Sequence, residues 1–173
     1  YDPTSHPAML VPLQNLGKQG TSLIAMSVDQ RGLLQPSASQ LTTFPLLCCC
    51  HVNNETGQMQ NLGQLRNAMD AKGILCVDAV QSFSKVPLPW EEARIDLAAI
   101  SSRKIGGPAS IGALICRRGI DLAPLILGGG QQRGLRSGTL DVVAIKLFAD
   151  SAEIACRNRD KEAKRILEFN LFL

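Results

Sequence analysis

Short apolar runs alternate along this chain with polar segments rich in turn-forming residues. Two of the runs, Ile74–Val77 and Leu97–Ile100, are short and contain branched side chains, which predicts buried parallel strands rather than helices. The connection between them, residues 79–96, is longer than the roughly dozen residues that a parallel crossover needs. We therefore expect both strands to lie parallel in one sheet, with their carboxyl ends at the same edge.

Three further apolar stretches, residues 22–28, 46–52 and 111–116, also predict strands. The polar segment 35–43 predicts a short exposed helix or a loop. Strands that alternate with helices along a chain are typical of α/β proteins. We therefore predict an α/β fold with a doubly wound, mostly parallel sheet flanked by helices.

Helical spacing of apolar residues predicts the helices. Two sets recur in this way: Met9, Leu13 and Leu16, and then Leu62, Leu65 and Met69. Residues 17–20 end the first helix, which contains Pro12 or is kinked by it, and Gly73 ends the second. A third helix is predicted from Val142 onward, apolar up to Ala155 and charged beyond, with Thr139 suited to its N-cap.

Side chains capable of chemistry follow the two central strands. Asp78 closes the first strand, and Lys104 follows the second in a segment that Gly106, Gly107 and Pro108 turn sharply. Open α/β sheets bind ligands at this edge. Pyridoxal phosphate (PLP) requires such a pair, because the amine forms a Schiff base and the acid keeps the pyridine nitrogen protonated. A plain ion pair between the two residues is the alternative explanation.

Composition narrows the classes of function. The 173 residues, 45% of them apolar, are enough for one core, which must be aliphatic because only 4% are aromatic. The net charge of +3 is mild, and no basic stripe interleaved with aromatic residues occurs, so nucleic-acid binding is not expected. No apolar run approaches the length of a membrane span, and we therefore expect no membrane partner.

Six cysteines occur, three of them consecutive at positions 48–50. Neighbouring residues of a strand point to opposite faces, so these three thiols cannot converge on one metal ion, and we interpret them as small core side chains. No metal site is expected. The opening YDPTSHPAML has neither the charged nor the apolar region of a secretory signal, which predicts a reducing, cytoplasmic location.

Several ordered motifs resemble the cysteine desulfurases, PLP-dependent enzymes of fold type I in aminotransferase class V. The motifs are HVNNETG (51–57), VDAVQS (77–82), DLAAISSRKIGGPASIGALICRR (96–118) and GGGQQRGLRSGT (128–139). The resemblance covers about residues 6–158, but only the middle of a family member more than twice as long. Because the chain lacks an initiator Met and starts inside the family pattern, we expect a fragment at the amino end.

The resemblance implies roles for residues around the ring of the cofactor. Lys104 would form the Schiff base and move protons at the substrate carbon, and His6 would stack on the ring and take part in proton transfer. Asp78 would face the pyridine nitrogen, while Asn54 and Gln81 would contact the phenolic oxygen. Without the resemblance, we would interpret His6 as a surface histidine near the end of the chain and Asn54 as a turn residue.

The phosphate contacts are implied in the same way. Ser101 and Arg103 would bind the phosphate of the same subunit, and Thr139 would reach the phosphate of its neighbour in a homodimer. Arg103 departs from the family, which usually has histidine there, but arginine can still clamp a phosphate. Gly106 replaces a residue that is usually aromatic.

The implied reaction converts L-cysteine to L-alanine and leaves the sulfur as a cysteine persulfide for a sulfur-acceptor protein, in iron–sulfur cluster or thio-cofactor synthesis. The family's persulfide cysteine and its substrate-binding arginine lie in a carboxyl-terminal part that these motifs do not cover, so the chain alone is expected to be inactive. Two alternatives stay open: a selenocysteine lyase on the same fold, and a non-catalytic remnant, which Arg103, Gly106 and the apolar end LEFNLFL favour.

We divide the chain into a partial PLP-binding large domain, residues 1–156, and a charged helix with an apolar tail, residues 157–173. The tail includes the apolar residues Leu167, Phe169, Leu171, Phe172 and Leu173. Such side chains expose apolar surface unless they dock on a partner, so this segment also favours an assembly of two or more chains.

Overall fold

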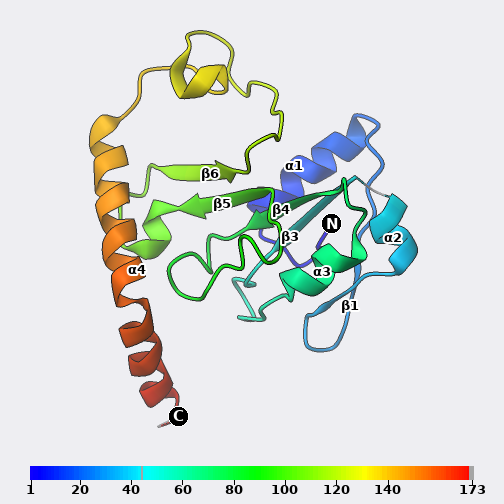
Figure 1. The fold of residues 1–173 in the computed structure, drawn as a ribbon, viewed down its shortest axis with the longest axis horizontal. Helices are drawn as coiled ribbons and strands as arrows, with labels where there is room; N and C mark the ends of the chain where they lie inside the picture. Colours follow the sequence, from blue (N-terminus) through cyan, green and yellow to red (C-terminus); the bar gives the residue numbers. More distant parts are fainter. Residues whose placement is uncertain (44, 172–173) are drawn as a thin grey trace.

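A four-stranded sheet forms the centre of the fold (Figure 1). The computed structural model describes residues 1–43 and 45–171, so Phe172 and Leu173 of the predicted tail lie outside the described residues. The strands of this sheet are β3 (Leu46–Cys50), β4 (Ile74–Asp78), β5 (Leu97–Ser101) and β6 (Gly112–Cys116). They lie in the order β3-β4-β5-β6, so each strand pairs with the next one along the chain.

Three of these strands run parallel, and the fourth reverses. β3, β4 and β5 are parallel neighbours, whereas β6 pairs with β5 in the antiparallel direction. The reversal follows from the short connection 102–111, because only an antiparallel partner can be reached through a tight turn. The predicted α/β fold with a mostly parallel sheet is therefore confirmed.

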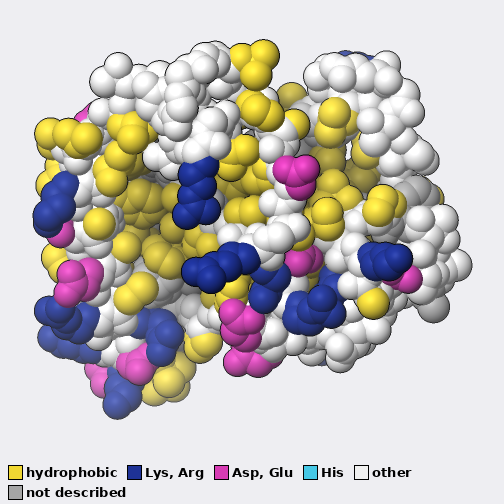
Figure 2. Space-filling model, turned by 45° about the horizontal axis from the view of Figure 1, so that its top comes forward, with side chains coloured by type: hydrophobic (Ala, Val, Ile, Leu, Met, Phe, Trp, Pro, Cys, Tyr) yellow, Lys and Arg dark blue, Asp and Glu magenta, His cyan; other side chains and the backbone are white. Residues whose placement is uncertain are grey.

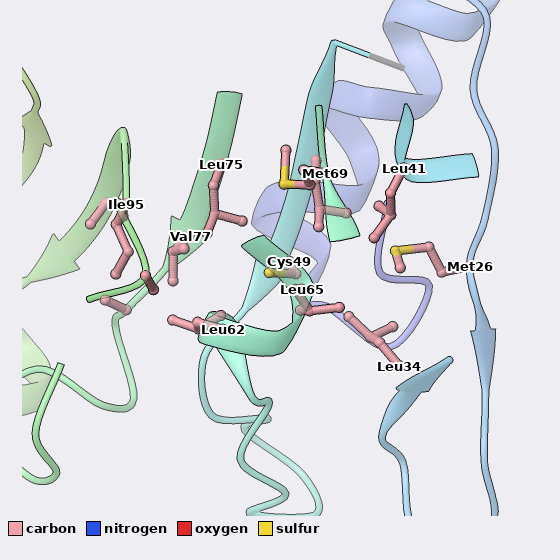
Figure 3. Close-up of a cluster of buried hydrophobic side chains, with 14 of the residues drawn as sticks. Met26, Leu34, Leu41, Cys49, Leu62, Leu65, Met69, Leu75, Val77 and Ile95 are labelled. Atoms are coloured by element: carbon pink, nitrogen blue, oxygen red, sulfur yellow. The ribbon is translucent and has the colours of Figure 1, made fainter. Parts of the chain in front are cut away.

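Helices lie on both sides of the sheet. α1 (Pro7–Lys18) runs behind β3 and β4 in Figure 3, and α3 (Leu62–Ala68) lies in front of them. α1 begins with Pro7, whose missing N–H is not needed there, and it continues past Pro12. Asn61 caps α3, because its side chain accepts a hydrogen bond from the backbone N of Gln64 at 2.9 Å.

The hydrophobic core fills the space between the sheet and α3. Leu75 and Val77 of β4 are fully buried, and Leu62 and Leu65 of α3 face them (Figure 3). Cys49 contributes from β3 and points to the same side (Figure 3). This alternation of buried residues sets the register of the central strands, since a slip by one residue would turn every core side chain to the opposite face.

The last helix, α4 (Val142–Asn170), runs along the other end of the sheet (Figure 1). It continues without a break through residues 156 and 157, where the sequence division was drawn. Its N-cap is Asp141, whose carboxylate accepts a hydrogen bond from the backbone N of Ala144 at 2.9 Å, so the prediction that Thr139 caps this helix is wrong. A carboxylate also suits the positive end of the helix dipole better than a hydroxyl.

The smaller elements differ from the predictions in extent. Residues 22–28 were expected to form one strand, but only β1 (Ser27–Val28) does, in a two-stranded sheet with β2 (Leu34–Gln35). The backbone before β1 bonds to the first residue instead: Tyr1 N donates to Ile24 O, and Met26 N donates to Tyr1 O. Helix α2 (Ala38–Thr43) occupies most of the segment predicted as helix or loop.

Two short 3-10 helices complete the fold: η1 (Ser102–Ile105), directly after β5, and η2 (Gln131–Gly134), in the long connection before α4. Among the helices that the structure describes, none combines the length and apolar character that crossing a bilayer requires.

Candidate active site at the carboxyl edge of the sheet

The carboxyl ends of β4 and β5 lie side by side, as the sequence spacing predicted. Asp78, the last residue of β4, is opposite Ala99 of β5 and Cys50 of β3. β5 ends two residues further on at Ser101, and η1 with Lys104 follows directly. Asp78 and Lys104 therefore leave the sheet at the same edge.

Asp78 is half-buried and only partly engaged. Its Oδ1 accepts a hydrogen bond from the backbone N of Val80 at 2.9 Å, and its backbone O accepts one from the N of His51 at 3.0 Å. Within the described residues, its Oδ2 has no hydrogen-bond partner, and no ion pair joins Asp78 to Lys104. The plain ion pair between Asp78 and Lys104, offered as an alternative, is therefore not formed. One carboxylate oxygen of Asp78 can still accept a hydrogen bond from a protonated ring nitrogen.

Lys104 is half-buried, and tight turns hold it. The last residue of its 3-10 turn is followed by Gly106 with φ of 83°, and the Gly106 N–H bonds back to Ser102 O. A left-handed backbone of this kind favours glycine over an aromatic residue. The turn geometry therefore gives a physical reason for Gly106, one of the two positions, with Arg103, at which this chain departs from the resembling family.

Gly107 lies where η1 meets α4. A Cβ atom at this position would lie 2.1 Å from Ser102 Oγ and 2.9 Å from Ser151 Oγ, so no larger residue fits without displacement. Ser102 is fully buried, and its Oγ has no hydrogen-bond partner within the described residues. This close approach holds the Lys104 turn against α4.

Gln81 and Lys85 follow Asp78 in the next turn of chain. The Lys85 Nζ donates a hydrogen bond to Gln81 Oε1 at 3.1 Å. Burial, and after it the positive charge of Lys104, lower the pKa of Lys85 below its usual value. The two lysines therefore lie close enough to repel each other.

A groove joins these lysines to α4. It has a volume of about 530 Å³ and lies between the turn that carries Ser84 and Lys85, the segment Lys104–Gly106 and the helix from Ser151 to Ile166. Arg159 and Glu162 supply charges of opposite sign on the helical side. Of the predicted cofactor ligands, Lys104 alone borders this groove. Asp78, Gln81 and the other predicted ligands do not line it.

The amino-terminal segment is tied to the same edge through Asp2, a residue that the sequence did not single out. Asp2 is fully buried, and its Oδ2 accepts hydrogen bonds from the backbone N of Cys50 at 3.2 Å and from Ser5 Oγ at 3.0 Å. Its Oδ1 accepts from the N and the Oγ1 of Thr4. His6 follows this anchored turn and is exposed, with Nδ1 accepting from the backbone N of Ala8 at 3.1 Å as the cap of α1.

The two asparagines after β3 have different surroundings. Asn53 is buried, donates to the backbone O of Thr4 at 2.8 Å, and accepts from the backbone N atoms of Glu55 and Thr56. The predicted ligand Asn54 is half-buried, and its Nδ2 donates only to Glu55 Oε1, at 2.6 Å. Asn53 therefore builds the turn, and Asn54 is the one whose side chain can be released to a ligand.

The predicted phosphate ligands carry no internal hydrogen bonds from their side chains within the described residues. Ser101 is half-buried and offers no capping bond to η1, and Arg103 is exposed. Thr139 is exposed in the connection between η2 and α4, and no described hydrogen bond joins it to the residues around Lys104. All three are free to bind an external group.

The cysteines of β3 are core residues, as predicted. Cys48, Cys49 and Cys50 are all buried, and Cys49 points to the opposite face of the sheet from the other two. Burial raises the pKa of Cys49, and a hydrogen bond from the Cys76 thiol lowers that of Cys48. Among the described residues, no group of three or more His, Cys, Asp or Glu side chains could hold a metal ion.

Comparison with known proteins gives a consistent result. Cysteine desulfurase IscS of Anaeromyxobacter sp. (strain Fw109-5) is 38% identical over 170 residues, which are 95% of this chain and 42% of that protein. Cysteine desulfurase IscS 1 of Archaeoglobus fulgidus is 35% identical over 164 residues, 93% of this chain and 43% of that protein. The chain therefore spans less than half the length of these relatives.

Solved structures show the same likeness. A NifS-like protein matches with a TM-score of 0.87 and 33% identity over 94% of this chain and 46% of its own. The structure of SspA in complex with cysteine matches with a TM-score of 0.80 and 32% identity, covering 88% of this chain and 46% of its own. The aminotransferase class-V family matches residues 1–166, and the chain therefore belongs to that family.

Proposed function

We propose that this chain carries the cofactor-binding part of a PLP-dependent cysteine desulfurase. One structural observation supports the proposal above the others: Asp78 and Lys104 emerge from neighbouring parallel strands of a class-V chain at one sheet edge. The relatives named cysteine desulfurases support the reaction, and the SspA structure supports cysteine as the substrate. The proposed reaction takes L-cysteine to L-alanine and leaves a persulfide.

The donor groups at this edge fit PLP. Asp78 keeps one carboxylate oxygen without a partner for the pyridine nitrogen, and Lys104 supplies an amine beside an open groove. Asn54 and Gln81 offer amide donors for the phenolic oxygen. Ser101 and Arg103 offer a hydroxyl and a cation for the phosphate, which arginine can bind through two N–H groups at once.

When bound, PLP supplies an electron sink for charge that develops at the substrate carbon. In this proposal the chain's own groups do the rest. Asp78 holds a proton at the pyridine nitrogen, Lys104 holds the cofactor and then takes or returns a proton at the substrate carbon, and His6 stacks on the ring and shares the proton transfers.

The proposed assembly is a homodimer in which Thr139 reaches the phosphate of the neighbouring subunit. Exposed apolar side chains on both sides of Thr139 support an interface there: Leu125, Leu127, Val142 and Val143 are 66–84% exposed. Figure 2 shows apolar side chains gathered around a hollow on this face of the molecule. Light scattering at working concentration tests this, and a monomer would remove the role of Thr139.

The wider setting belongs to the same proposal. A complete enzyme would pass the persulfide sulfur to an acceptor protein in the cytoplasm, for iron–sulfur cluster or thio-cofactor synthesis. The persulfide itself needs an exposed cysteine in an electropositive surrounding. The buried thiols of β3 do not offer that. Cys116 and Cys156 are exposed, but the resemblance places the sulfur-carrying cysteine in a carboxyl-terminal part of the family that these motifs do not cover, and the proposal keeps that assignment.

The deciding experiment adds PLP to the purified protein, reduces with borohydride and maps the labelled peptide. We expect yellow absorbance and a label on Lys104, and no covalent label in Lys104→Ala. Lys72→Ala is the matched control, because Lys72 is an exposed lysine that precedes β4 at the opposite edge of the sheet. A label spread over Lys72, Lys85 and Lys104 would mean ordinary amine chemistry and would refute the proposed site.

A further inference from the structure

The hydrogen bond between Lys85 and Gln81 fixes which way the Gln81 amide faces. The two residues are four positions apart in the turn after β4, and Lys85 Nζ lies 3.1 Å from Gln81 Oε1. An ammonium group has three donors and no acceptor, so only the amide oxygen can face it. The Gln81 NH₂ group must therefore point away from Lys85.

That NH₂ group is available for another partner. Within the described residues, no hydrogen-bond acceptor meets Gln81 Nε2. Gln81 itself is half-buried and follows Asp78 by only three positions, at the sheet edge where the candidate site lies. The turn thus presents a pair of N–H donors at the edge, in the direction that the exposed Lys85–Gln81 hydrogen bond sets.

Lys85 is also a neighbour of Lys104. Both lysines line the groove beside α4, and the charge of Lys104 contributes to the lowered pKa of Lys85. Gln81, Lys85 and Lys104 therefore form one polar cluster, drawn from two separate turns of the sheet edge. None of the salt bridges among the described residues neutralises Lys85.

We infer that Lys85 is a positioning residue that holds the Gln81 amide with its N–H groups toward the phenolic oxygen of bound PLP. This inference rests on the proposed function. Its chemical basis is the two-fold ambiguity of an amide: without Lys85 the group can rotate by 180° and place its oxygen against the anionic phenolic oxygen. With Lys85 present, that orientation would bring the NH₂ group against a cation.

The consequence is measurable on the cofactor itself. A donor held on the phenolic oxygen stabilises the more negative, deprotonated form of the Schiff base, and it therefore lowers the pKa of that Schiff base. Loss of one such hydrogen bond, worth about 1.4 kcal/mol, corresponds to a shift of about one pH unit. Lys85→Met should therefore raise the pKa of the Schiff base by about one unit and weaken PLP binding several-fold.

The test titrates the visible absorbance of the PLP-loaded protein for the wild type, Lys85→Met, Lys85→Arg, Gln81→Ala and the double variant Lys85→Met/Gln81→Ala. Lys85→Arg keeps a cationic donor and should restore the wild-type titration. Gln81→Ala should shift the titration as Lys85→Met does. In the Gln81→Ala background, Lys85→Met should add little, because the residue through which Lys85 acts is already gone.

Two results would overturn the inference. An unchanged titration in Lys85→Met would show that the amide needs no anchor. An equal shift from Lys85→Met with and without Gln81 would show that Lys85 acts by its charge on Lys104 alone. Failure of the proposed function looks different, because the wild type itself would then form no Schiff base at Lys104, and the inference would fall with it.

Discussion

Asp2 and Cys50 join the beginning of the chain to the carboxyl end of β3. The Asp2 Oδ2 accepts hydrogen bonds from both the backbone N of Cys50, at 3.2 Å, and its Sγ, at 3.1 Å. Asp2 is fully buried although its side chain is a carboxyl group. This contact places His6, four residues later, near the edge that bears Asp78.

Replacing Asp2 should therefore cost stability. Asp2→Ala leaves the buried N–H of Cys50 and the hydroxyl of Ser5 without an acceptor, and we expect a loss of about 3 kcal/mol in the free energy of unfolding. Urea denaturation followed by circular dichroism measures it. Asp121→Ala, at an exposed aspartate, is the matched control and should change stability little. Equal effects of the two would contradict the structural role of Asp2.

Gly107→Ala should disturb the turn that carries Lys104. The added methyl group would lie 2.1 Å from Ser102 Oγ and 2.9 Å from Ser151 Oγ, so η1 and α4 must separate. We expect a loss of about 1–3 kcal/mol in stability, as for other overpacked sites, together with weaker PLP binding. Gly130→Ala is the control, because a methyl group added there would meet nothing within 4 Å and the φ of Gly130 is −81°. Thermal denaturation of both variants separates steric clash from a general effect of replacing glycine.

His51 should make stability depend on pH on the acid side. It is 2% exposed, its Nδ1 has no partner within the described residues, and burial lowers its pKa below 6.5. The unfolded chain binds a proton here as the pH falls below about 6.5, but the folded chain resists it, so this contribution to stability is full above that pH and is lost below it.

The measurement compares urea midpoints between pH 7 and 5 for the wild type and His51→Phe. The midpoint should fall with acid in the wild type and fall less in the variant. Both proteins also carry the substitution His6→Gln, so that wild type here means wild type at position 51. The reference protein then has His51 as its one histidine, and the His51→Phe variant has none. Parallel pH profiles would mean that His51 accepts its proton in the folded chain.

Thiol reactivity should divide the cysteines by exposure. Cys116 and Cys156 are exposed, whereas Cys49 is fully buried and burial raises its pKa. Brief treatment with iodoacetamide and peptide mass spectrometry should label Cys116 and Cys156 first, and Cys49 only after unfolding in urea. Rapid labelling of Cys49 in the native protein would show that β3 is open to solvent.

The apolar pattern of the sequence predicted the central strands well. Ile74–Val77 and Leu97–Ile100 became β4 and β5, in which buried and half-buried positions alternate, because runs this short and rich in branched side chains favour strands over helices. The length of the connection then implied the parallel direction, and with it the shared edge of Asp78 and Lys104. Local sequence was sufficient to predict these strands, because the apolar runs and the turn residues that bound them act within a few positions of each other.

Other features depend on contacts between distant residues, and only the tertiary structure decided them. Asp141 caps α4 where Thr139 was expected, and Asn53 builds the turn, a role that the sequence offered only for Asn54. Asp96 pairs with Arg66 at 3.7 Å in the interior, a partnership across 30 positions that no local pattern indicates. Asp2 is buried with donors from Thr4, Ser5 and the distant Cys50 around its carboxylate.

The orientation of the Gln81 amide depends both on local sequence and on tertiary structure. Its spacing from Lys85 is local and visible in the sequence, but a lysine four residues away on a surface turn usually points to solvent. Lys85 is indeed exposed, and only the folded chain shows that it donates to Gln81 and borders the groove with Lys104 and α4. The sequence by itself therefore determined which polar groups stand at the sheet edge, and tertiary packing decided how they face, since packing excludes water and restricts the rotation of each side chain.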